Sequence, residues 1–254
     1  MKKKFFSFWA IFVPLILWLV ITVSPAQAET DQVIYFVPHQ DDETLYMGAD
    51  ISQQYRLGRQ VIVVLVTNGN ASGVRYLLCK QKNVCLTKMQ FTAARNDEMI
   101  AAVKRLAPNA VIRYENSQDG NLTKAQALAI LNKHLKLYPN ASFNSTSWMD
   151  DHPDHRALAY AMKEVCLGKY PIANEDCRLF QGRDYWISRP VTGSFIAGNV
   201  SEFAAADEYA LWNPSIGRYG IGQQSVPESF TAMRKDPRNR YHLATDRQHT
   251  PVMK

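Results

Sequence analysis

The chain has 254 residues and a formal net charge of +6, and hydrophobic residues make up 46% of it. Three of the positive charges are Lys2, Lys3 and Lys4, so the chain after residue 28 carries about +3. That remainder has no lysine-rich run and no nucleic-acid-binding motif, which argues against a nucleic-acid partner. About 225 residues are enough for one α/β domain with a full core, and no repeat or linker divides them.

The first 28 residues have the pattern of a signal peptide. The lysines are followed by an apolar run over residues 5–23 and by the small-x-small cleavage site Ala26-Gln27-Ala28. We therefore expect a signal peptide over 1–28 and one domain over 29–254, with a secreted or periplasmic/cell-envelope location. The apolar run approaches the length of a membrane span, so an uncleaved anchor is the alternative, and a membrane is expected as a partner only in that case.

The first predicted strand, residues 33–37, leads into an acidic turn, Pro38-His39-Gln40-Asp41-Asp42-Glu43. A helix over 44–57 follows and ends at Gly58. The turn therefore lies at the carboxyl end of a strand, where open α/β sheets build their sites. His39 and Asp42 are three residues apart and could hold one metal ion while Asp41 points elsewhere. The alternative is a solvated loop with acidic residues at a helix N-terminus.

The next segments alternate between strands and helices, which predicts a Rossmann-like, three-layer α/β sandwich with a mostly parallel sheet. No Gly-x-Gly-x-x-Gly follows the first strand, so a dinucleotide cofactor is not indicated. The segment 70–86 is long for a connection, and we expect it to be a loop that forms one wall of a substrate cleft. The predicted order is a strand over 61–66, that loop, a helix over 87–106, a strand over 110–114, a turn at Asp119-Gly120 and a helix over 123–138.

A second acid-and-histidine cluster, Asp150-Asp151-His152-Pro153-Asp154-His155, follows a strand-like run over 142–148. Pro153 suits the first position of a helix that continues to residue 167. A helix N-terminus disfavours imidazolium, which keeps histidine neutral and able to bind metal. His39, Asp42 and one histidine of this cluster make the three-ligand set of a catalytic zinc site. Iron(II) or cobalt would fit the same ligands.

The two clusters resemble the motifs of the PIG-L/LmbE family of zinc-dependent N-acetylglucosamine deacetylases. The usual family motifs are Pro-His-Pro-Asp-Asp-Glu and His-Pro-Asp-His, and Gln40 stands where the first has proline. That departure loosens the turn but removes no ligand. The resemblance covers roughly residues 32–167, and weaker family pieces match in order: Val66-Thr67-Asn68-Gly69, Arg95-Asn96-Asp97-Glu98 and Asp119-Gly120.

The resemblance implies a role for each residue of the two motifs. His39, Asp42 and His155 would bind Zn²⁺, and Asp41 would be the general base on a zinc-bound water. His152 would face the substrate and stabilise the oxyanion or protonate the leaving amine.

Three further residues take supporting roles by the same resemblance. Asp154 would orient a histidine. Arg95 and Asp119 occupy positions where the family contacts sugar hydroxyls. Taken without the resemblance, Arg95 would be a solvated helix residue and Asp119 part of a turn.

The implied function is an exported zinc-dependent hydrolase that removes the N-acetyl group from an N-acetylglucosamine-type sugar or glycoconjugate. One alternative is a non-catalytic carbohydrate-binding protein on the same scaffold. Another is a metal-dependent amidase of a different substrate class, although the His-Glu-x-x-His of zincin peptidases is absent from the sequence. The sequence indicates neither the particular sugar nor the oligomeric state.

Four cysteines lie after the predicted signal peptide. An even number in an exported chain favours two disulfides, and four cysteines can pair in three ways. We predict Cys79–Cys85 and Cys166–Cys177, because each pair brackets a loop-like stretch. A thiolate metal site is the alternative, but no Cys-x-x-Cys supports it.

The last third shows no family motif. We expect a strand over 179–188 and a loop over 212–222, with no metal role for the histidines at 242 and 249. Residues 191–200 are rich in glycine and short polar side chains. His134, among lysines on a predicted helix, is expected to be exposed.

Overall fold

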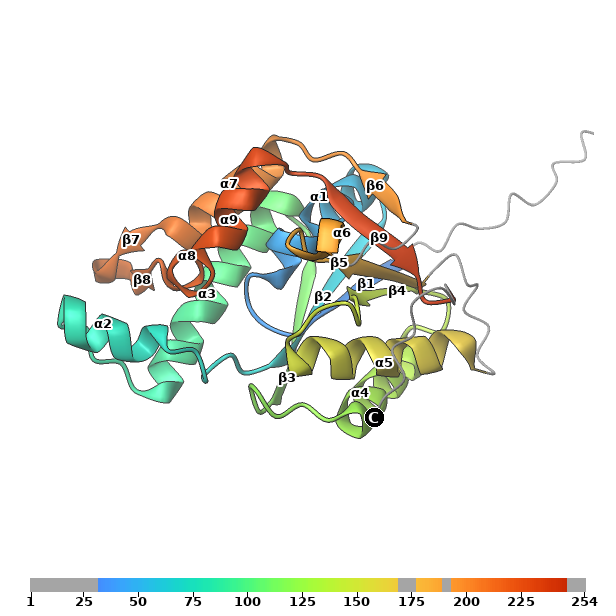
Figure 1. Cartoon of the computed structure of the whole chain (residues 1–254), viewed down its shortest axis with the longest axis horizontal. Coiled ribbons are helices and arrows are strands. Elements are labelled where there is room, and N and C mark those ends of the chain that lie inside the picture. The colour runs from blue at the N-terminus through green and yellow to red at the C-terminus, as the bar shows by residue number, and fades with distance from the viewer. Residues whose placement is uncertain (1–31, 169–176, 189–192, 246–254) are drawn as a thin grey trace, which may run out of the picture.

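The structure is a computed structural model that describes residues 32–168, 177–188 and 193–245 (Figure 1). The predicted signal peptide and His249 lie outside the described residues. Within these ranges, no helix combines the length and the hydrophobicity that crossing a membrane requires.

Seven of the described strands form one sheet in the order β3-β2-β1-β4-β5-β9-β6. The first five strands run parallel, and β9 and β6 add an antiparallel edge, so the predicted mostly parallel sheet is confirmed. Their bounds are β1 (Gln32–Val37), β2 (Gln60–Thr67), β3 (Val111–Ser117), β4 (Ser142–Thr146), β5 (Cys177–Gln181), β6 (Ser194–Ile196) and β9 (Asn239–Leu243).

Helices cover both faces of the sheet and complete three layers, as expected (Figure 1). Successive side chains of a strand point to opposite faces. Ile34 and Phe36 of β1 therefore pack in one core with α4 (Lys124–Leu137) and α5 (Pro153–Leu167). Val33 and Tyr35 pack in the other core. That second core is closed by α1 (Asp42–Arg56), α3 (Lys88–Leu106), α7 (Val200–Ala210) and α9 (Pro227–Lys235).

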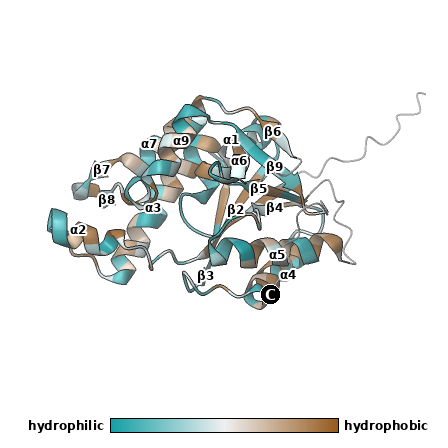
Figure 2. Ribbon diagram, viewed as in Figure 1, coloured by the Kyte–Doolittle hydropathy of each residue, from teal (hydrophilic) through white to brown (hydrophobic). Residues whose placement is uncertain are grey.

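Hydrophobic colour is plain on β2, which lies between the helical layers (Figure 2). The chain leaves β1 toward β2 and β3 on one side and later returns to β4 and β5 on the other. The strand order thus reverses between β1 and β4, and open α/β sheets bind ligands in the crevice outside the carboxyl ends at such a point. Both predicted clusters follow these two strands.

The structure corrects three expectations. The segment 70–86 contains a helix, α2 (Val74–Lys82), which buries only Val74 and Leu78 and is too short for a clear periodic signal. The predicted strand over 179–188 is only β5, followed by the short helix α6 (Tyr185–Ser188). His134 is not exposed: only 2% of it is accessible, because it packs edge-on against Phe36.

The last third holds more regular structure than the sequence indicated, and the segment expected as a loop over 212–222 contains two short strands and the start of a helix. It contains α7, α9 and β9, together with α8 (Ile221–Ser225) and a small hairpin of β7 (Trp212–Asn213) and β8 (Arg218–Tyr219). His242 lies in β9 and is buried, where its Nε2 is 2.7 Å from the hydroxyl of Ser147.

Both predicted disulfides, Cys79–Cys85 and Cys166–Cys177, are confirmed. The first joins α2 to the loop after it, and the second joins the end of α5 to the start of β5.

Candidate functional site

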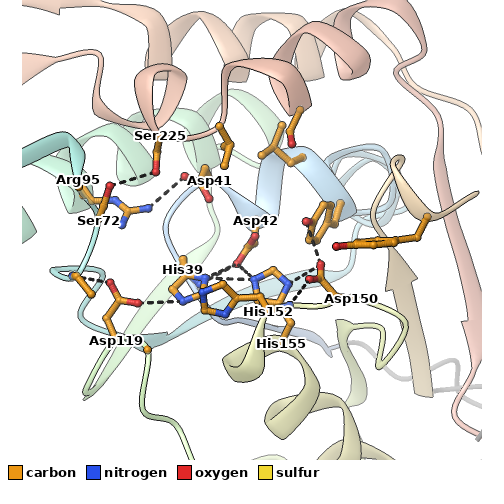
Figure 3. A pocket seen from close by; sticks show the side chains of 18 residues that line it. His39, Asp41, Asp42, Ser72, Arg95, Asp119, Asp150, His152, His155 and Ser225 are labelled. Carbon is orange, nitrogen blue, oxygen red and sulfur yellow. Dashed lines mark hydrogen bonds and ion pairs between the residues drawn. The ribbon is translucent and has the colours of Figure 1, made fainter. Parts of the chain in front are cut away.

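The turn after β1 separates two neighbouring carboxylates. The carbonyl of Pro38 accepts hydrogen bonds from the backbone N–H (3.1 Å) and the hydroxyl (2.8 Å) of Thr67, which ties the turn to β2. Asp41 then adopts a φ of 102°, which few residues other than glycine tolerate. As a result Asp42 points to the histidines while Asp41 points toward α3 (Figure 3).

Three predicted ligands converge at the carboxyl ends of β1 and β4. His39 Nδ1 lies 3.4 Å from Asp42 Oδ2 and 3.2 Å from His155 Nε2. His155 Nε2 lies 3.2 Å from the same Asp42 oxygen. All three side chains are buried, and they come from the turn after β1 and the first turn of α5 (Figure 3).

Other carboxylates hold the outer nitrogens of these two histidines. His39 Nε2 lies 3.1 Å from Asp154 Oδ2 and 3.2 Å from Asp119 Oδ1. His155 Nδ1 lies 2.9 Å from Asp150 Oδ2. Such carboxylates fix the orientation of a metal-binding histidine. The sequence assigned no role to Asp150, although its place directly before the second motif was a usable signal.

The imidazoles and carboxylates stabilise one another's charge. Burial lowers the pKa of His155, but Asp42 and Asp150 outweigh it and raise that pKa to about 9. Burial raises the pKa of Asp42, yet His155 and His39 hold it well below its usual range. The carboxylates therefore require positive charge between them, which imidazole protons supply and a divalent cation can supply instead.

Asp41 belongs to a different arrangement. Arg95 Nη2 donates to Asp41 Oδ2 at 3.1 Å and to the carbonyl of Gln40 at 2.8 Å, and its Nη1 donates to the carbonyl of Gly69 at 2.7 Å. Burial raises the pKa of Asp41 to about 8, against the lowering effect of the Arg95 charge. The carboxyl group can therefore exchange a proton near neutral pH.

The strained backbone of Asp41 is fixed from the last third of the chain. Its N–H donates to Tyr209 Oη at 2.9 Å and to Glu43 Oε2 at 3.1 Å. The hydroxyl of Tyr209 donates in turn to Glu43 Oε1 at 2.6 Å. Sequence reasoning missed Tyr209, because nothing in its neighbourhood on α7 marks it as part of a site.

His152 is the exposed histidine of the cluster. Its ring meets the His39 ring edge-on, with centroids 4.5 Å apart. Its Nδ1 accepts the backbone N–H of Asp154 at 3.2 Å, so in the neutral ring the proton lies on Nε2. Burial and the neighbouring His39 and His155 lower the pKa of His152, which favours this neutral form.

The cluster lines a cavity of about 570 Å³, within the size range of small-molecule sites. The loop over 71–73 and the segment around Ser225 form one side, where the hydroxyls of Ser72 and Ser225 lie 3.3 Å apart (Figure 3). Tyr46 and Tyr185 also line the cavity. The expectation that segment 70–86 forms a cavity wall thus holds for its first residues.

Arg95 and Asp119 also line this cavity, but their side chains form hydrogen bonds and ion pairs with protein atoms. The guanidinium of Arg95 binds Asp41 and two carbonyls, and Asp119 contacts His39 and accepts the N–H of Ala71 at 2.7 Å. Contact of either residue with a sugar stays a prediction.

The three inner atoms fit a tetrahedral zinc ion. Zinc–nitrogen and zinc–oxygen bonds of about 2.0–2.2 Å place neighbouring ligand atoms about 3.3–3.5 Å apart. The three separations of 3.2–3.4 Å among His39 Nδ1, Asp42 Oδ2 and His155 Nε2 match this distance between ligand atoms. Two other groupings also bring possible metal ligands within 4.8 Å of one another: His39, His152 and His155, and His39, Asp119 and Asp154. The second uses the outer nitrogen of His39, where carboxylates serve as orienting partners.

A family model described as PIG-L, GlcNAc-PI de-N-acetylase, matches residues 34–166, a stretch that runs from β1 to α5 and contains both motifs. The chain is thus a hydrolase of the metal-dependent N-deacetylase class. It belongs to the PIG-L family. A comparison with curated proteins finds no match.

Solved structures share this fold at low sequence identity. The zinc-inhibited form of teicoplanin deacetylase Orf2 is 14% identical, with a TM-score of 0.58 over 85% of this chain and 99% of that one. N,N'-diacetylchitobiose deacetylase from Pyrococcus horikoshii is 16% identical, with a TM-score of 0.60 over 88% of each chain. GalB, a 4-carboxy-2-hydroxymuconate hydratase from Pseudomonas putida, is 15% identical, with a TM-score of 0.59 over 87% and 99%. Because a hydratase is among them, this likeness defines the fold and leaves the reaction to the family and the site.

Proposed function

We propose that this chain is an exported, zinc-dependent hydrolase that removes the acetyl group from an N-acetylglucosamine-type sugar or glycoconjugate. The observation that carries the proposal is the separation of two functions in one cavity. His39, Asp42 and His155 present three donor atoms 3.2–3.4 Å apart, while the Asp41 carboxylate lies outside that set. Amide hydrolysis needs both a Lewis acid and a separate base.

Zinc held by His39, Asp42 and His155 would polarise the amide carbonyl and lower the pKa of water to about 7. Asp41 accepts a proton from the water that attacks the acetyl carbon, as its raised pKa favours. The Nε2–H of His152 donates to the developing oxyanion or to the departing nitrogen. The carbon–nitrogen bond breaks, the amine takes up the proton, and acetate leaves.

Three observations support the substrate and the location. Two of the similar structures are named as deacetylases, one of teicoplanin and one of N,N'-diacetylchitobiose. The cavity of about 570 Å³ has room for a sugar residue. The predicted signal peptide and the two disulfides agree with an oxidising compartment outside the cytoplasm.

Acetate release from a panel of N-acetylglucosamine-containing substrates tests this function. The protein is stripped of metal and assayed with and without one equivalent of zinc, because excess zinc could mask activity, as the name of the zinc-inhibited neighbour suggests. We expect zinc-dependent release in the wild type and its loss in Asp41→Ala and His155→Ala. Asp97→Ala, which removes an exposed carboxylate of α3, is the matched control and keeps its activity.

The other outcomes separate the alternatives. Zinc binding without release from any substrate, in wild type and Asp41→Ala alike, would favour a non-catalytic carbohydrate-binding protein. Zinc-dependent hydrolysis confined to amides that carry no sugar would indicate an amidase of another class. Release that persists in His155→Ala without zinc would contradict the proposed ligand set.

A further inference from the structure

A small outer lobe lies beside the catalytic cavity at one end of the molecule. It consists of α2 with its disulfide and of the β7–β8 hairpin, which lie next to each other (Figure 1). A separate apolar cluster joins the lobe to α3 and α8, and its members are Val74, Leu78, Phe91, Ala94 and Ile221.

Large apolar side chains point away from this cluster into solvent. On α2 the exposed fractions are 64% for Tyr76 and 39% for Leu77, and on the hairpin they are 44% for Trp212 and 61% for Ile216. Lys82 links the two elements, because its Nζ lies 5.9 Å from the centre of the Trp212 ring. Exposed apolar groups concentrated in one lobe mark an interaction surface.

The same lobe is positively charged. Residues 68–96 contain no aspartate or glutamate, and neither do residues 209–227. Lys80, Lys82 and Lys88 are all exposed, and no ion pair of theirs is formed within the described residues. Lys80 instead lies over the ring of Tyr76, at 5.8 Å from its centre. Surfaces that enter the headgroup region of anionic bilayers have this composition: tryptophan and tyrosine beside lysines, without acidic residues.

The lobe also forms part of the rim of the cavity. Ala71, Ser72 and Gly73 line the cavity and lead directly into α2. Ser225, which lines the cavity too, ends α8, the helix that packs against α2. A surface bound by the lobe would therefore lie close to the cavity entrance.

We propose that the outer lobe docks this protein on an anionic lipid bilayer. Leu77 and Ile216 favour a lipid over a charged glycan as the partner. Transfer of aliphatic side chains out of water is favourable, and these side chains offer a polysaccharide no hydrogen bond. The lysines face the anionic headgroups while Trp212 and Tyr76 lie at the level of the interface. The proposal adds a binding function and does not depend on the deacetylase activity.

Tryptophan quenching by lipids with brominated acyl chains tests the docking. The full chain, as isolated after export, is mixed with phosphatidylglycerol vesicles or with neutral phosphatidylcholine vesicles. The difference between wild type and Trp212→Phe isolates Trp212 from the other tryptophans, whether or not residues 1–28 are retained. We expect Trp212 to be quenched by the anionic brominated vesicles and much less by the neutral ones. Equal quenching of wild type and Trp212→Phe would overturn the proposal.

A charge variant provides the second readout. Lys80→Glu with Lys82→Glu is expected to raise the anionic lipid concentration for half-maximal Trp212 quenching by at least about tenfold. Lys104→Glu with Lys136→Glu changes two exposed lysines elsewhere and should leave that concentration unchanged. An equal response of both pairs, or binding to a soluble polyanion without any lipid quenching, would contradict docking by this lobe. Thermal unfolding of each variant checks that its fold is intact.

Discussion

Asp41 is the residue on which the proposed chemistry depends, and its conformation is costly. A side chain at a φ of 102° is strained, and such strain persists only where the surroundings impose it. Here Arg95 holds the carboxylate, and Tyr209 and Glu43 hold the backbone N–H. Tyr209 on α7 thus fixes the proposed base, which lies between β1 and α1.

Tyr209→Phe tests this support. The substitution removes the hydroxyl that donates to buried Glu43 and accepts the Asp41 N–H. We therefore expect the free energy of unfolding to fall by about 1–3 kcal/mol. We also expect kcat to fall, with zinc affinity nearly unchanged because no ligand contacts Tyr209. Tyr160→Phe is the control, since the Tyr160 hydroxyl has no hydrogen-bond partner in the described part of the chain. Denaturation and acetate release measure both effects, and equal behaviour of the two variants would refute the role of Tyr209.

Gln40 fills the position of the family's proline in a way that the sequence did not suggest. Its side chain is fully buried, and its Nε2 donates to Asn96 Oδ1 at 2.7 Å. It packs directly on Gly69: a Cβ at Gly69 would lie 1.9 Å from Gln40 Oε1 and 2.9 Å from Arg95 Nη1. The turn is therefore held by side-chain packing against α3 where proline would restrict φ.

Gly69→Ala should disturb this packing and the base together. Gly69 has a φ of +63° and Gly58 a φ of +80°, so alanine at either position costs about 1–2 kcal/mol of backbone strain. Nothing lies within 4 Å of a Cβ at Gly58, which makes Gly58→Ala the matched control. We expect only Gly69→Ala to lower kcat, by displacing Gln40 and Arg95. Equal turnover in the two variants would show that Gln40 does not position the active residues.

At the scale of elements, α3 fixes α8 at the cavity wall through Glu98. This buried carboxylate accepts the backbone N–H groups of Ile221 at 2.8 Å and Gly222 at 2.9 Å. Burial raises the pKa of Glu98 to about 7, against the lowering effect of these two hydrogen bonds. The residue belongs to the Arg95-Asn96-Asp97-Glu98 family piece, yet its partners are 123 and 124 residues away in the chain.

The raised pKa of Glu98 predicts how stability depends on pH. Below about pH 4.5 both the folded and the unfolded protein carry a protonated Glu98, whereas between about 4.5 and 7 only the unfolded chain ionises. Stability from this group is therefore lost as pH rises through that window, by about 3 kcal/mol. Urea denaturation measures the unfolding free energies of wild type and Glu98→Gln across this pH range. We expect the wild-type value to fall relative to that of the variant as pH rises. A constant difference would contradict the raised pKa, and Glu228→Gln on α9 is an exposed control.

At the scale of the whole molecule, the proposed metal site joins two segments that are far apart in the chain. His39 and Asp42 belong to the first strand–helix unit, and His155 lies 116 residues after His39 at the start of α5. A cation bound by all three would favour the folded state, in which alone the ligands meet.

Zinc removal should therefore lower the thermal stability. With free zinc at about a thousand times its Kd, binding stabilises the fold by about 4 kcal/mol, which corresponds to a Tm shift on the order of 10 °C. Calorimetry with zinc and with a chelator measures this shift. His155→Ala should lose most of the response, and an unchanged Tm in the wild type would show that the three side chains do not bind zinc together.

The sequence by itself determined the strand–helix order through residue 167 apart from α2, both disulfides, and the place of the two motifs at the ends of β1 and β4. These features depend on local signals: apolar runs, Pro153 at a helix start, and the spacing of short motifs. The motif resemblance also pointed to the PIG-L family, which the family match confirmed.

Only the tertiary structure decided which groups surround the proposed ligands. Asp119 and Asp154 meet on one nitrogen of His39, and Tyr209 reaches Glu43 across 166 residues. The helices α7, α8 and α9 could not be recognised as walls and supports of the site from local pattern. Such contacts join residues that share no local period or motif, so their partners are set by how the layers pack around the sheet.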